Sequence, residues 1–132
     1  WSRGLGDVYK RQTYNNVMDA WFIKYDPNEY MFITELKTHA EMSADKCNKF
    51  ETGEELSDQL AMKSALFYNY AKYQPHNTVI LRAAKELDDI VIGLRNQYKN
   101  EVQVGPAFCK AKLKNIVQGA ESIQRAVGAK PR

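Results

Sequence analysis

The chain has 132 residues, of which 44% are apolar and 27% are charged, and its formal net charge is +3. This balance is too apolar for a disordered chain, and 7 glycines with 4 prolines are too few for a sandwich or barrel with many tight turns. The 2 cysteines cannot make a disulfide framework and lie at no zinc-binding spacing. No stretch approaches the roughly 18 apolar residues of a membrane-spanning helix.

The N-terminal segment has an unusual origin. Residues 2–12 read SRGLGDVYKRQ, which resembles the in-frame translation of a transposase sequencing adapter. We therefore expect residues 1–12 to be non-native and residues 13–132 to be a piece of a longer protein. Without residues 1–12 the chain carries 16 basic and 15 acidic side chains, so it is nearly neutral.

The first native segment predicts a helix over residues 14–24. Its apolar side chains recur at the spacing of one helical face, and Pro27 then interrupts the pattern. These side chains are Tyr14, Val17, Met18, Trp21 and Phe22.

The next segment contains no proline and one glycine between residues 29 and 73. Its apolar residues keep a heptad spacing, with a one-residue phase slip after Gly53. We expect one long helix over residues 29–73, about 67 Å in length at 1.5 Å per residue. The alternative is a break at Gly53, where residues 52–55 fit a capping box, and it would give a compact bundle.

Two further helices are predicted, over residues 78–103 and residues 106–127. Asn77 or Thr78 is expected to cap the first by accepting backbone N–H groups, and Pro106 suits the first turn of the second. The fold class is therefore all-α, an elongated antiparallel coiled coil. Its core or dimer seam is expected to contain Leu36, Cys47, Phe50, Leu60, Phe67, Leu87, Leu94, Leu113 and Ile116.

The sequence offers little chemistry for catalysis. No phosphate loop, nucleophile elbow or paired-histidine motif is present, so we expect no enzyme activity, no metal and no cofactor. His39 and Cys47 lie eight residues apart, but two ligands do not make a zinc site. We interpret Cys47 and Cys109 as small buried thiols.

Charge is distributed unevenly along the chain. Residues 13–100 carry 10 basic and 13 acidic side chains, whereas residues 101–132 carry 6 basic and 2 acidic ones. A basic helical face can attract anionic lipid headgroups, and an ordinary solvated face is an equally good reading. The candidate membrane-facing cations are Lys110, Lys112, Lys114 and Arg125.

Several segments resemble the BAR domain of sorting nexins. They are residues 19–22 (DAWF), the long helix that follows, residues 55–64 (ELSDQLAMKS) and residues 84–90 (AKELDDI). The resemblance rests on scattered positions over about residues 17–127, and Pro27, Pro75 and Gly105-Pro106 depart from it.

The resemblance implies a partial, non-catalytic module that dimerises with the same fold and senses membrane curvature. It also implies phosphoinositide binding, a place in protein transport, and a cytoplasmic location on the surface of endosomes. The alternative is a compact helical adaptor or scaffold, viral or bacterial, with no membrane role. A third reading, a nucleic-acid accessory protein that uses the basic tail, is weaker, and no nucleic-acid partner is expected.

Overall fold

The computed structural model describes residues 24–100 and 103–131. Within them the protein is all-α, with 4 helices, 84% helical content and no strands. The helices are α3 (Pro27–Met42), α4 (Phe50–Lys72), α5 (Thr78–Lys99) and α6 (Pro106–Gly128), and a 3-10 helix, η1 (Ala44–Asn48), joins α3 to α4. The predicted helix over residues 14–24 lies almost wholly outside the described residues.

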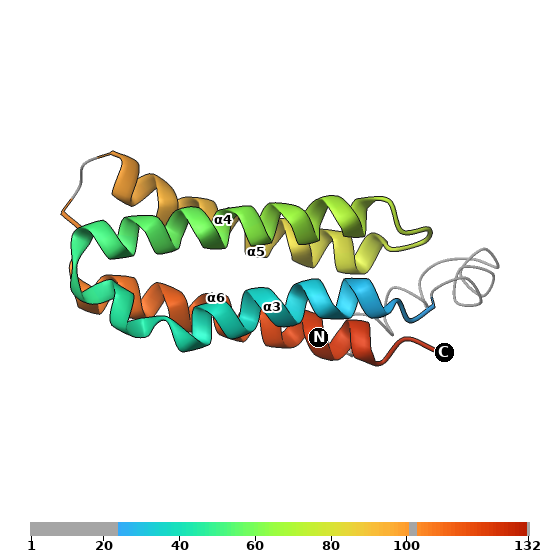
Figure 1. Ribbon diagram of the computed structural model, residues 1–132. Helices are drawn as coiled ribbons and strands as arrows, with labels where there is room; N and C mark the ends of the chain where they lie inside the picture. The colour runs from blue at the N-terminus through green and yellow to red at the C-terminus, as the bar shows by residue number, and fades with distance from the viewer. Residues whose placement is uncertain (1–23, 101–102, 132) are drawn as a thin grey trace.

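Each helix runs antiparallel to the two helices that it packs against, and the four form a bundle (Figure 1). In this bundle α3 packs against α4 and α6, and α5 packs against the same two helices. One end of the bundle carries η1 and the starts of α4 and α6. The opposite end carries the start of α3, the α4–α5 loop and the end of α6.

The single helix expected over residues 29–73 is wrong, because the chain turns back between α3 and α4. Helix α3 ends at Met42, and η1 follows with a turn in which the Lys46 N–H donates to the Ser43 carbonyl at 3.0 Å. The Thr52 hydroxyl then donates to the Lys46 carbonyl at 2.6 Å, which ties η1 to the start of α4. The turn lets both halves of the apolar stripe face each other inside one chain, so α4 spans only about 35 Å.

The break does not lie at Gly53 either, since this residue sits in the first turn of α4. A Cβ atom at Gly53 would lie 2.2 Å from the Tyr98 hydroxyl oxygen. Glycine is needed there because the Tyr98 ring of α5 crosses close to the backbone of α4. The two halves of the apolar pattern belong to α3 and α4, so the phase slip between them accompanies the change of helix and not a break at Gly53.

The predicted seam is the core of a single chain. All of its residues are buried except Phe50, which is 37% exposed at the first position of α4 and packs edge-on against the Tyr98 ring. Side chains that are buried inside one chain are not accessible for contact with a second chain. The buried seam residues are Leu36, Cys47, Leu60, Phe67, Leu87, Leu94, Leu113 and Ile116.

The last two helices begin where the sequence predicts. Helix α5 starts at Thr78 and ends at Lys99, four residues before the predicted end, while α6 runs one residue beyond the prediction. Pro106 occupies the first turn of α6, where its missing N–H has no intrahelical partner to lose.

Candidate functional site

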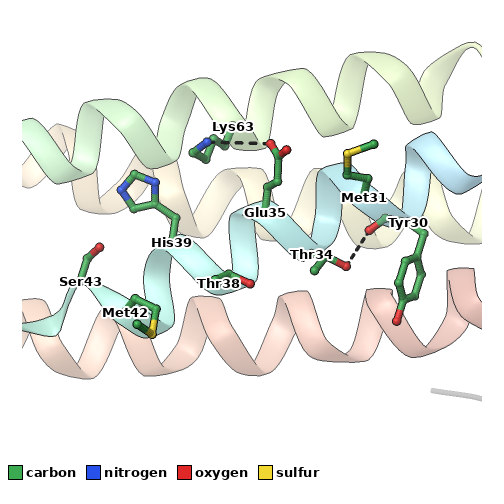
Figure 2. Close-up of a pocket in the computed structure, with 9 residues that line it drawn as sticks. All are labelled: Tyr30, Met31, Thr34, Glu35, Thr38, His39, Met42, Ser43 and Lys63. Atoms are coloured by element: carbon green, nitrogen blue, oxygen red, sulfur yellow. Dashed lines mark hydrogen bonds and ion pairs between the residues drawn. The ribbon is translucent and has the colours of Figure 1, made fainter.

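A shallow groove of about 630 Å³ lies over the outer face of α3. Figure 2 shows its lining residues, most of them from α3, with Lys63 of α4 at one side. They are Tyr30, Met31, Thr34, Glu35, Thr38, His39, Met42, Ser43 and Lys63. Prediction from sequence missed this groove, because the single long helix expected there presents no such recess.

Helical geometry explains the character of the groove. Met31, Thr38 and Met42 recur at intervals of 7 and 4 residues, so they lie along one line of α3. Ile33, Leu36 and Ala40 are buried on the opposite side of the helix. Met31 is 49% exposed and Met42 is 74% exposed, so apolar side chains that would normally be buried face the solvent.

The charged groups of the groove balance one another. The Lys63 ammonium lies 4.0 Å from the Glu35 carboxylate. Burial and the nearby Lys63 charge lower the pKa of His39, and its hydrogen bond with Gln59 only partly opposes them. His39 is therefore neutral at pH 7, and the groove is a mainly apolar surface crossed by one ion pair.

The end of the bundle that carries η1 is closed by a disulfide. Cys47 of η1 and Cys109 of α6 are bonded across 62 residues of sequence, with their Cα atoms 5.6 Å apart. Both side chains are buried as predicted, but the prediction of free thiols is wrong. Because its sulfur atom is bonded to Cys109, Cys47 cannot act as a metal ligand together with His39.

The opposite end of the bundle holds a buried polar triad. The Lys130 ammonium donates to Glu29 Oε1 at 2.5 Å and to Asn77 Oδ1 at 2.8 Å. Asn77 Nδ2 in turn donates to Glu29 Oε2 at 2.7 Å and to the Ala71 carbonyl at 3.1 Å. Asn77 is the N-cap residue of α5, as expected, but its side chain accepts no backbone N–H of that helix, because the amide instead joins Glu29, Ala71 and Lys130.

A second polar contact lies beside this triad. The Tyr70 hydroxyl of α4 donates to Asp26 Oδ2 at 2.6 Å, and Asp26 Oδ1 accepts the backbone N–H groups of Asn28 and Glu29. Partial burial alone would raise the pKa of Asp26, but these hydrogen bonds and the Lys130 charge hold it below its usual value. The triad and the Tyr70–Asp26 contact both join the start of α3 to neighbouring parts of the bundle, so each has a structural role.

The predicted basic face is only partly assembled. At 100° per residue, Lys110, Lys114 and Arg125 fall within about 60° of one another on the exposed side of α6. Lys112 points to a different side, where its ammonium lies 5.4 Å from the centre of the Phe108 ring. Arg125 is also paired with Glu121 at 2.7 Å, so fewer cations share a face than the sequence predicts.

Within the described residues, no group of three or more histidine, cysteine or acidic side chains is placed to hold a metal ion. None of the helices in the same part of the chain is long and apolar enough to cross a membrane. Comparisons with models of protein families, with curated proteins and with solved structures found no match.

Proposed function

We propose that this chain is a compact, non-catalytic helical adaptor or scaffold module that binds a partner protein through the groove over α3. The observation that carries the proposal is the exposure of Met31 and Met42 on the floor of a mainly apolar groove. Thioether side chains are flexible and polarisable, so they adapt to the shape of a bound segment. A groove that follows a helix suits an extended or helical peptide better than a small substrate.

The disulfide bears on where the module would act. Disulfides form and persist in oxidising compartments, such as the bacterial periplasm or the cell exterior, and are rare in the cytosol. The buried Cys47–Cys109 bond therefore favours an oxidising compartment over the cytoplasmic surface of endosomes. It favours the adaptor over the sorting-nexin-like module for the same reason.

Selection from a displayed library of helical peptides tests the proposal. The full chain is the bait, and a Thr38→Arg variant, which places a long cation in the middle of the groove, is the counter-selection bait. Asn115→Arg adds the same side chain at an exposed position of α6 and is the matched control. We expect peptides to be enriched by the wild type and by Asn115→Arg but not by Thr38→Arg. Equal enrichment by all three baits, or none, would refute a binding role for the groove.

A second candidate is the membrane-associated dimerisation module that the sorting-nexin resemblance implies. The observation that favours it is the shared exposed face of Lys110, Lys114 and Arg125. Co-sedimentation with anionic vesicles separates the two candidates, since charge reversal of these cations abolishes binding only if they face a membrane. Small-angle scattering at several protein concentrations adds a second criterion, because the dimer is larger than the compact monomer expected of the adaptor.

A further inference from the structure

The methionines of this protein are distributed in an unusual way. All three that lie in the described residues are exposed, and all three lie on α3 and α4: Met31, Met42 and Met62, the last being 75% exposed. Methionine is normally among the residues most often buried. The same two helices and the residue that follows α4 also expose Leu66, at 48%, and Tyr73, at 81%.

Acidic side chains continue this apolar surface along α4. At 100° per residue, Met62, Leu66 and Tyr73 fall within about 60° of Glu51 and Glu55, so all five point away from the core. Leu60 and Phe67 are buried on the opposite side of the helix. Within the described part of the chain, neither Glu51 nor Glu55 takes part in an ion pair.

The rows of exposed side chains on α3 and α4 lie on neighbouring faces of the bundle. The two helices are held together by the Glu35–Lys63 ion pair and by the Phe32 and Tyr70 rings, whose centres are 5.1 Å apart. We call the combined area the α3–α4 surface, defined by Met31, Met42, Met62 and Leu66 with Glu51 and Glu55. Its apolar residues on α4 are Met62 and Leu66, its acidic residues lie toward the start of α4, and the Lys63 ammonium, paired with Glu35, lies between the two helices.

We infer that the partner presents a basic amphipathic helix to the α3–α4 surface. An amphipathic helix can lay its apolar side chains against the methionines, and its cations then face the unpaired Glu51 and Glu55. Such charge complementarity selects a basic partner and disfavours an acidic one. The inference rests on the proposed adaptor function, because it names the chemistry of that partner.

The experiment uses two synthetic peptides of about 18 residues, each about 27 Å long as a helix. One has an apolar leucine face and a lysine face, and its twin has glutamate in place of every lysine. Binding to the full chain is measured by fluorescence anisotropy. Carbon-13 labelling of the methionine methyl groups reports which part of the protein each peptide contacts.

Two double variants and one matched control locate the contact. Met42→Ser with Met62→Ser removes apolar area and is expected to weaken binding of the lysine peptide about tenfold or more. Glu51→Lys with Glu55→Lys is expected to weaken it by a similar factor at low salt. Glu86→Lys with Asp89→Lys makes the same change in net charge on exposed positions of α5 and is expected to alter the affinity by less than about twofold.

The inference holds if the lysine peptide binds more tightly than its twin, shifts the methionine signals and responds only to the α3–α4 variants. It fails if both peptides bind equally, or if the α5 control weakens binding as much as Glu51→Lys with Glu55→Lys. Methionine shifts that depend on protein concentration without peptide would assign the surface to a second copy and also overturn it. If the displayed library yields only uncharged or acidic peptides, the adaptor function stands and the basic partner is excluded.

Discussion

The Cys47–Cys109 disulfide gives the sharpest test of the fold. Replacing both residues by alanine removes the bond that fastens η1 to α6, at the end of the bundle where the chain turns back. Alanine is preferable to serine, because both positions are buried and a serine hydroxyl would be left without a partner there.

The size of the effect follows from the length of the loop that the bond closes. For a separation of 62 residues, the loop-closure entropy lost from the unfolded chain is about 14 cal/mol/K, or about 4 kcal/mol at 25 °C. Loss of the two buried sulfur atoms adds roughly 1 kcal/mol through poorer packing. We therefore expect the free energy of unfolding of the double alanine variant to fall by about 5 kcal/mol, a large share of the 5–15 kcal/mol typical of a domain.

Urea denaturation followed by circular dichroism measures this change on three samples. They are the oxidised wild type, the wild type kept reduced with a phosphine, and the double alanine variant. The reduced wild type isolates the effect of the bond, and the variant adds the loss of packing. A free energy of unfolding that is the same within about 1 kcal/mol in all three samples would refute the entropic argument. Reaction of the folded, oxidised protein with a thiol reagent would refute the pairing itself.

Three further predictions concern buried or partly buried polar groups. Tyr98→Phe removes a buried hydroxyl that has no hydrogen-bond partner in the described structure, and it should raise the free energy of unfolding by about 1 kcal/mol in urea titrations. Lys130→Met leaves the buried carboxylate of Glu29 without its cation, so the same titrations should show a loss of about 3–5 kcal/mol. Tyr70→Phe removes a hydrogen bond that lowers the pKa of Asp26 below 3.8, so it should reduce stability at neutral pH. Because a lowered carboxyl pKa stabilises the fold only above its unfolded value, the wild type and Tyr70→Phe stability curves should converge as the pH falls below about 4. A difference that is constant with pH would contradict this assignment.

The apolar periodicity predicted the helical class and most of the buried positions, because each helix buries one side and the spacing of that side is local. Leu87, Leu94, Leu113 and Ile116 illustrate this. Periodicity did not place the turn between α3 and α4, since a one-residue phase slip is compatible both with an irregular continuous helix and with two separate helices. At the turn η1 packs against α4 and α6, and Cys47 is bonded to a residue 62 positions away, contacts that no local pattern encodes.

The polar contacts at the other end of the bundle could not be predicted either, because they also join residues far apart in the sequence. Glu29 and Lys130 are 101 residues apart, and each alone is typical of a solvent-exposed helix terminus. The 2 cysteines are the one signal in the sequence that points to a long-range contact. Cys47 and Cys109 both occupy apolar seam positions, and two buried cysteines in one small core are candidates for pairing.

The two ends of the bundle and its sides thus differ in their capacity to adapt. A covalent bond fixes the end at η1, and the Glu29–Asn77–Lys130 triad fixes the other, so neither end can reshape itself around a ligand without losing stability. Within the described residues, all three methionines expose apolar area on the outer side of α3 and α4. For the proposed adaptor, anchored ends would reduce the conformational entropy lost on binding, while methionines would let the surface between them fit more than one partner segment. Rigid ends and adaptable side chains between them favour the proposed module, which binds a peptide along α3 and α4, over a ligand site at either end.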